Sequence, residues 1–263
     1  MRLIIISSIL FFIFFLCVGS FNNVLIYRIP NNEQFVSGRS HCIKCNHELQ
    51  WYDNIPLFSF ILLKGKCRYC GEPISPRYPI VEAVTSILAS IISIYYLCTL
   101  DLYSEPYKII IPFVMGLSVC MMVALSVIDF NTLEIPMGFN IFLFCMGIII
   151  TVLTGNYLEH IIGMISVSTF LFLVFFITSG KGLGFGDVKL MFALGLLLGW
   201  KSIVIGFFIG CILAIIIHSI RMKVSKESHV LAFGPYLCMG AYIGVFIGEP
   251  IINAYISFLN SLT

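Results

Sequence analysis

Charge is the scarcest property of this sequence. Only 11% of its 263 residues are Asp, Glu, Lys or Arg, whereas soluble domains contain about 25%. Hydrophobic residues make up 59% of the chain, and the mean hydropathy is +1.03. This balance excludes a soluble globular domain and predicts an all-α protein that crosses a membrane many times.

Other signals are also missing. The chain has no low-complexity tract, no solenoid-type repeat and no basic patch interleaved with aromatic residues, so we expect no nucleic-acid binding. The N-terminal run LIIISSILFFIFFLCVG exceeds the apolar core of a signal peptide, which is about 7–15 residues long. No small-residue cleavage site followed by a polar start is present. We therefore interpret this run as a retained first transmembrane helix.

Long apolar runs predict about eight transmembrane helices, since one span needs about 20 residues. Their expected positions are 3–26, 79–99, 108–128, 136–154, 160–179, 184–200, 202–220 and 231–258. With an external N-terminus, this arrangement leaves twelve of the 15 Lys and Arg residues in cytoplasmic loops, as the positive-inside rule predicts. The chain then divides into a first transmembrane helix (1–27), a cytoplasmic cysteine-containing loop (28–79) and a seven-helix membrane core (80–263).

The cytoplasmic loop contains the motifs CIKC and CRYC, which together give C-x2-C-x21-C-x2-C. Two such turns can offer four thiolates to tetrahedral Zn²⁺, and a loop this small buries too little core to fold without help. Disulfides are disfavoured in a reducing cytoplasm, and no βαβ pattern supports a thioredoxin-like pair. His41 and His47 are alternative ligands. The sequence predicts a structural zinc bound by Cys42, Cys45, Cys67 and Cys70.

Two aspartates lie at the ends of predicted spans. Asp129 ends the third span in ALSVIDFNTLEIP, and Asp187 begins the sixth in GLGFGDVKL. Charged residues near membrane depth are costly and usually functional. Two neighbouring carboxylates share a proton, so one can activate a water molecule while the other polarises a peptide carbonyl. Glycines beside Asp187 would allow an extended peptide to approach.

The residues alone leave other functions open. A pair of membrane acids also suits a proton-coupled transporter with a zinc-stabilised cytoplasmic cap. A membrane scaffold whose cysteine loop binds partners would need no acid pair, and either aspartate could simply cap a helix or pair with Lys181 or Lys189. Transport predicts acids near the middle of spans, whereas these lie at cytoplasmic ends, which favours peptide hydrolysis.

Five blocks of the chain, in order, resemble the type IV prepilin peptidases, bacterial membrane aspartyl proteases of the GxGD class. The blocks are GSFNNVLIYRIP (19–30), the cysteine loop (40–82), DFNTLEIP (129–136), GFGD (184–187) and FGP (233–235). The resemblance implies that Asp129 and Asp187 form the catalytic pair, that Gly184 and Gly186 support it, and that the four paired cysteines bind the metal. Met137 departs from the family, which often has an acidic residue there.

The resemblance also implies a substrate, a second reaction and a location. Family members remove the positively charged leader of type IV prepilins or pseudopilins at the cytoplasmic face of the bacterial inner membrane, which serves pilus assembly or protein secretion. Many then methylate the new N-terminus with S-adenosylmethionine, and Gly65 matches a position linked to that step. The expected protein is a multi-pass peptidase with methyltransferase activity. The oligomeric state is left open.

Overall fold

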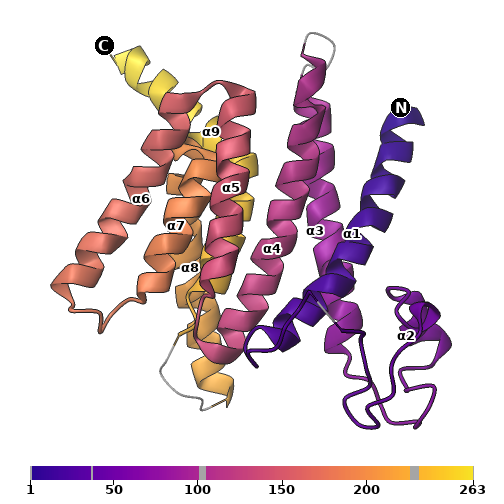
Figure 1. Ribbon diagram of the computed structural model, residues 1–263. Helices are drawn as coiled ribbons and strands as arrows, with labels where there is room; N and C mark the ends of the chain where they lie inside the picture. Colours follow the sequence, from indigo (N-terminus) through magenta and orange to yellow (C-terminus); the bar gives the residue numbers. More distant parts are fainter. Residues whose placement is uncertain (1, 37, 101–104, 226–230, 263) are drawn as a thin grey trace. The chain divides into compact units, whose positions relative to one another are not determined.

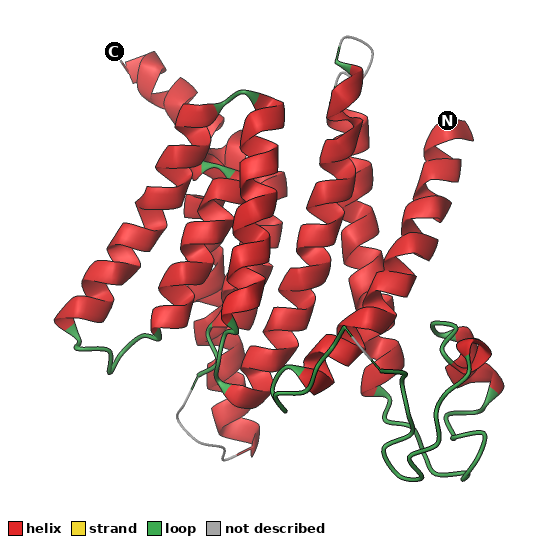
Figure 2. Cartoon of the chain, viewed as in Figure 1, coloured by secondary structure: helices red, strands yellow, loops and turns green. Residues whose placement is uncertain are grey.

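The computed structural model describes residues 2–36, 38–100, 105–225 and 231–262. Within these ranges the chain consists of helices and loops, with two isolated β-bridges and no strand (Figure 2). The helices are α1 (Arg2–Arg28), α2 (Phe58–Leu62), α3 (Arg77–Thr99), α4 (Ile110–Thr132), α5 (Met137–Thr154), α6 (Tyr157–Ile177), α7 (Phe185–Leu198), α8 (Trp200–Ser225) and α9 (Gly234–Leu262), with 3₁₀ turns at Trp51–Asp53 and Pro106–Ile109 (Figure 1). The predicted all-α membrane architecture is confirmed.

Seven helices in the described ranges are long and apolar enough to span a membrane, namely α1, α3, α4, α5, α6, α8 and α9. The span expected at 184–200 forms the shorter helix α7, which has 14 residues. At about 1.5 Å per residue, α7 falls short of a hydrocarbon core about 30 Å thick. Contacts with α5, α6, α8 and α9 surround α7, so its ends can meet protein rather than lipid.

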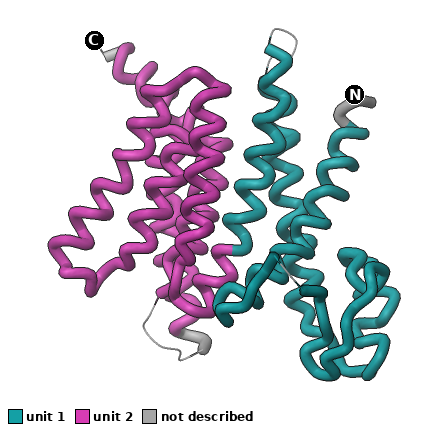
Figure 3. The backbone as a smooth tube through the Cα atoms, in the orientation of Figure 1, with its two compact units in different colours: residues 1–124 teal, residues 125–263 magenta. Residues whose placement is uncertain are grey.

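The chain forms two compact units, residues 1–124 and 125–263, with the boundary inside α4 (Figure 3). In the first unit, α1 packs against α3, and the cysteine loop connects them. Buried amides support this unit: the Asn22 side chain donates to the Cys120 carbonyl at 2.7 Å, and the Asn23 side chain donates to the Tyr78 carbonyl at 3.1 Å. The Glu82 carboxylate on α3 accepts the backbone N–H of Leu57 at 2.8 Å, which ties the loop to the helix.

In the second unit, the helices α5 to α9 approach one another at glycines. A Cβ atom on Gly163 of α6 would lie 2.5 Å from the carbonyl oxygen of Gly195 on α7, and one on Gly206 of α8 would lie 2.8 Å from that of Gly240 on α9. Only glycine permits backbones to approach this closely, as small residues do in many membrane helix pairs. The α8–α9 contact therefore relies on backbone packing and places the first residue of α9 at the site described next.

Candidate functional site

Asp129 lies in the last turn of α4 and is 4% exposed. Its Oδ2 atom accepts a hydrogen bond of 2.9 Å from the backbone N–H of Gly234, the first residue of α9. The N–H groups at a helix start have no partner inside the helix, and the helix dipole favours negative charge there. A residue 105 positions later in the chain therefore orients the Asp129 carboxylate.

Asp187 is the third residue of α7 and is 8% exposed. Its backbone N–H donates to the Gly184 carbonyl at 3.2 Å. Its carboxylate is close enough to Asp129 for the two charges to interact. The Cys238 thiol of α9 also interacts electrostatically with both carboxylates. The end of α4 and the starts of α7 and α9 thus bring together the two aspartates that the sequence predicted as a pair.

The glycines around this pair are in close contact with the protein itself. A Cβ atom on Gly184 would lie 3.3 Å from Asp187 Oδ2, and one on Gly186 would lie 3.2 Å from the Cβ atom of Ile135. A Cβ atom on Gly234 would lie 2.6 Å from Asp129 Oδ2. Sequence reasoning attributed the first two glycines to substrate access and gave Gly234 no role. The one sequence feature that could have indicated Gly234 was the FGP block (233–235). The structure explains the glycine of this block by its contact with Asp129.

The second candidate site lies in the loop of the first unit. The Sγ atoms of its four paired cysteines all lie within 4.8 Å of one another, and those of Cys42 and Cys70 are 3.9 Å apart. A tetrahedral zinc with bonds of about 2.3 Å separates its sulfur ligands by about 3.8 Å. The cluster therefore has the size and donor set that a zinc ion requires. Its members are Cys42, Cys45, Cys67 and Cys70.

The same backbone turn supports both cysteine pairs. The Cys42 N–H donates to the His47 carbonyl at 3.0 Å, and the Asn46 N–H donates to the Cys42 carbonyl at 2.8 Å. The second pair repeats this pattern from Cys67, with Gly71 in the place of Asn46. Asn46 and Gly71 have φ values of 54° and 74°, a left-handed conformation that Asn and Gly adopt most readily. The sequence therefore encodes two copies of one ligand-presenting turn.

The surroundings of the cluster favour thiolate at Cys42. Burial alone would raise the pKa of this thiol, but hydrogen bonds from the Cys45 and Lys44 backbones help to lower it to about 7. Thiolate is the form that binds metal. His47 instead packs against the Tyr69 ring, with centroids 3.6 Å apart and the rings tilted by 34°. Neither His41 nor His47 belongs to the cluster found among the described residues.

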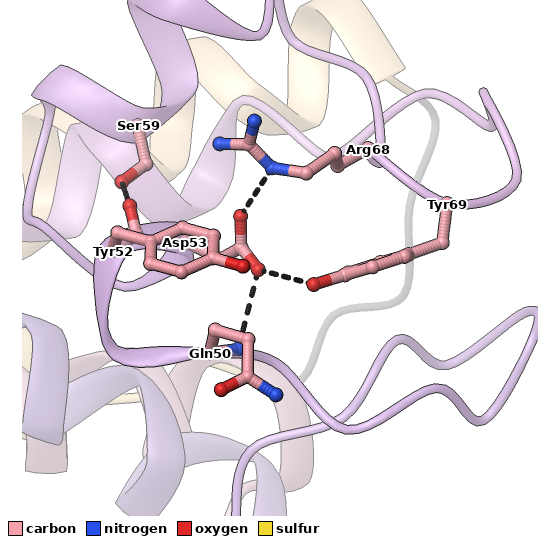
Figure 4. Close-up of polar contacts among 6 residues, drawn as sticks. All are labelled: Gln50, Tyr52, Asp53, Ser59, Arg68 and Tyr69. Atoms are coloured by element: carbon pink, nitrogen blue, oxygen red, sulfur yellow. Dashed lines mark hydrogen bonds and ion pairs between the residues drawn. The ribbon is translucent and has the colours of Figure 1, made fainter.

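The carboxylate of Asp53 links separate parts of this loop by hydrogen bonds (Figure 4). It accepts hydrogen bonds from Arg68 Nε at 2.7 Å, Tyr69 Oη at 2.9 Å and the Gln50 N–H at 3.2 Å. The side chain is only 2% exposed. Burial would raise the pKa of Asp53, but these donors outweigh it and hold the pKa below its usual range. The carboxylate thus connects the second cysteine pair to the 3₁₀ turn at Trp51–Asp53.

We expect Asp53→Asn to destabilise the loop by about 1–3 kcal/mol, because it removes a buried, charge-assisted acceptor. The stabilisation from a depressed carboxyl pKa is present above the unfolded pKa of about 3.9 and is lost as the pH falls through the lower folded value. At pH 7 this stabilisation is fully present in the original protein, so proteases should cleave the loop faster in Asp53→Asn than in the original.

Glu48→Gln is the matched control for Asp53→Asn. Glu48 pairs with Arg39 at 3.5 Å, but both side chains are about two-thirds exposed, so its loss should change stability by less than about 1 kcal/mol. Equal proteolysis rates for the two variants would contradict the role given to Asp53.

Gly65 has a structural reason to be glycine. Its φ is +69°, and a Cβ atom there would lie 3.2 Å from the Phe60 ring. This explains the residue through the fold of the loop, and its part in methyl transfer stays a prediction.

Comparison with known proteins finds a matching family. Residues 13–96 match the family model described as Bacterial Peptidase A24 N-terminal domain, and residues 116–219 match the Type IV leader peptidase family. The chain is 30% identical to the prepilin leader peptidase/N-methyltransferase of Aeromonas salmonicida, over 94% of this chain and 93% of that protein. It is 30% identical to the protein of that name in Legionella pneumophila over the same shares, and 32% identical to the one in Myxococcus xanthus over 74% of this chain and 57% of the relative. No solved structure gives a significant match.

Proposed function

Because the chain belongs to the type IV leader peptidase family, we propose that it is a membrane aspartyl endopeptidase that removes the leader of type IV prepilins or pseudopilins. The observation that carries this proposal is the pairing of two buried aspartates, Asp129 and Asp187, at the converging ends of three helices. The names of the relatives support a second activity, methylation of the new N-terminus.

The aspartate pair can perform hydrolysis without another group. The ionised carboxylate takes a proton from water as the water oxygen attacks the peptide carbonyl carbon, and the protonated carboxyl donates to the carbonyl oxygen. When the tetrahedral intermediate collapses, the C–N bond breaks and the leaving amine takes a proton from the pair. The roles belong to the pair as a unit, because the two carboxyls titrate together. Gly234 contributes by holding Asp129 in one orientation.

The metal and the methyl donor belong to the first unit in this proposal. Zinc at the cysteine cluster would fix the loop, and no step of peptide hydrolysis passes through it. S-adenosylmethionine supplies an electrophilic methyl group. Because it carries a carboxylate and cationic groups of its own, its site needs both basic and acidic side chains. A polar cavity of about 550 Å³ beside the first cysteine pair offers both signs of charge, with Arg28, Glu33, Arg39 and Glu48 in its lining. We propose that these residues hold the methyl donor.

The distribution of Lys and Arg supports a cytoplasmic location for the aspartate pair in a bacterial inner membrane. The transporter alternative gains no support, since both aspartates lie in terminal turns of their helices rather than at mid-span.

The function is tested by expressing the chain in membranes with a type IV prepilin and methyl-labelled S-adenosylmethionine. We expect the leader to be removed and the label to appear on the mature N-terminus. An uncleaved prepilin would refute the peptidase, whereas cleavage without label would leave a peptidase alone.

Gly234→Ala tests how Asp129 is positioned. The added methyl group would meet Asp129 Oδ2 at 2.6 Å and should push the carboxylate out of line, which we expect to lower kcat about a hundredfold with little change in KM. Gly138→Ala is the matched control, because Gly138 also lies in the first turn of a helix and a Cβ atom there meets nothing within 4 Å. Equal kcat values in the two variants, both folded, would refute the positioning role.

A further inference from the structure

An apolar groove runs along the second unit between α5, α6 and α7. Its volume is about 520 Å³, and almost all of its lining is apolar. Phe144 of α5, Phe172 of α6 and Phe192 of α7 belong to its walls. Phe185 and Lys189 line it near the start of α7, where the Lys189 ammonium lies 4.7 Å from the centre of the Phe185 ring. This groove is separate from the aspartate pair, because α7 turns Phe185, Val188 and Phe192 toward it and Asp187 toward Asp129.

One buried polar side chain in this groove has no partner. Asn140 of α5 is 4% exposed, and neither its Nδ2 nor its Oδ1 atom has a hydrogen-bond partner among the described residues. Ser168, which also lines the groove, donates to a carbonyl of its own helix and is therefore satisfied. An unpaired amide in an apolar membrane setting is costly. Neighbouring side chains cover both amide atoms, so a ligand in the groove reaches this donor and acceptor only when the Asn140 side chain turns toward it.

A peptide group matches these two unused positions. One backbone unit offers a C=O to Nδ2 and an N–H to Oδ1, whereas a lipid acyl chain offers neither. A substrate segment near a bond to be cleaved must leave the helical conformation, which frees such backbone groups inside the membrane. Asn140 is the fourth residue of α5 and Asp187 the third of α7, and both helices start at the same end of the unit (Figure 1). The amide therefore lies at a depth similar to that of the aspartate pair.

Resting on the proposed peptidase function, we propose that this groove receives an apolar segment of the peptide substrate and that Asn140 hydrogen-bonds its backbone. The substrate would pass the start of α7 between groove and aspartates. At this point Phe185 faces the groove and packs on Phe175, with ring centroids 5.3 Å apart. Asn140 is a substrate-positioning residue in this arrangement.

The first test is kinetic and uses the full chain with a type IV prepilin. Asn140→Leu should fold at least as well as the original, since it removes two unpaired polar groups, but we expect KM to rise about tenfold with kcat within about twofold. Thr151→Val is the matched control, because Thr151 is buried in the same helix and its hydroxyl bonds only the Gly147 carbonyl. It should leave KM unchanged. An unchanged KM for Asn140→Leu would overturn the proposal while leaving the peptidase intact.

The second test reports binding without cleavage. A photo-crosslinking residue at Phe172, inside the groove, should capture the labelled prepilin, and one at Phe170 should not. Both side chains are about half exposed on α6, but only Phe172 lines the groove. Capture of lipid alone at Phe172, or equal capture of prepilin at both positions, would overturn the groove assignment. If the original chain neither cleaves nor captures prepilin, the proposed function and this inference both fail.

Discussion

We expect Asp187→Asn and Asp129→Asn each to lower the rate of leader cleavage by at least about a thousandfold. Neither amide can take up or release the proton that hydrolysis requires. The replacements keep the shape of the side chains, so the helix ends should stay packed. The Asp129→Asn amide can still turn its oxygen toward the Gly234 N–H, which preserves the hydrogen bond seen at 2.9 Å. The loss would therefore report chemistry and not misfolding.

Two further variants sharpen this experiment. The double variant should be no slower than either single one, because residues that act as a unit are not additive. Glu134→Gln is the control: Glu134 is an exposed carboxylate only five positions from Asp129, and its loss should leave cleavage unchanged. Cleavage within tenfold of the original rate in either aspartate variant would exclude the pair as the catalytic centre.

Removal of the metal should have the second largest effect. Purified protein should contain one zinc per chain, and Cys67→Ser should abolish it and expose the loop to proteases. Structural zinc contributes about 10–16 kcal/mol to the folding of small domains, far more than the other contacts of this loop can replace. Cys67 is the buried member of the cluster, so its replacement should be the most damaging.

Cys98→Ser serves as the control for the metal site, because Cys98 is an exposed cysteine of α3 outside the cluster. Zinc content should stay at one per chain in this variant. A protein without zinc, in which alkylating reagents modify all four paired cysteines, would rule out the site. Retention of zinc in Cys67→Ser would show that another residue completes the ligand set.

Sequence patterns that act locally were the ones that predicted structure well. Hydropathy predicted the long helices, and the C-x2-C motifs predicted the four-sulfur cluster because each turn is built within a few residues. The length of α7 was overestimated, since hydropathy does not register that Gly199, with φ of 78°, ends the helix. Its contacts with four other helices, which allow so short a helix inside a membrane protein, cannot be read from one sequence.

Contacts between distant segments could not be predicted in this way. The partner of Asp129 is a backbone N–H, which every residue except proline carries, so no residue type marks Gly234 for this role. Asn140 is one polar residue in an apolar span, and only the packed structure shows that its amide has no partner among the described residues. The sequence suggested the two aspartates as a pair, and the family resemblance marked them as catalytic. Spacing alone could not show that the fold brings together two carboxylates with 57 residues between them.

The bond from Gly234 to Asp129 also sets an order of events during synthesis of the chain. Asp129 and Asp187 leave the ribosome before α9 exists, and the N–H that fixes Asp129 arrives only with the first residue of that helix. Close contacts at the glycines of α8 and α9 hold that helix in position. On the proposed mechanism, a nascent chain therefore becomes competent for hydrolysis only when the first residue of α9 has reached Asp129.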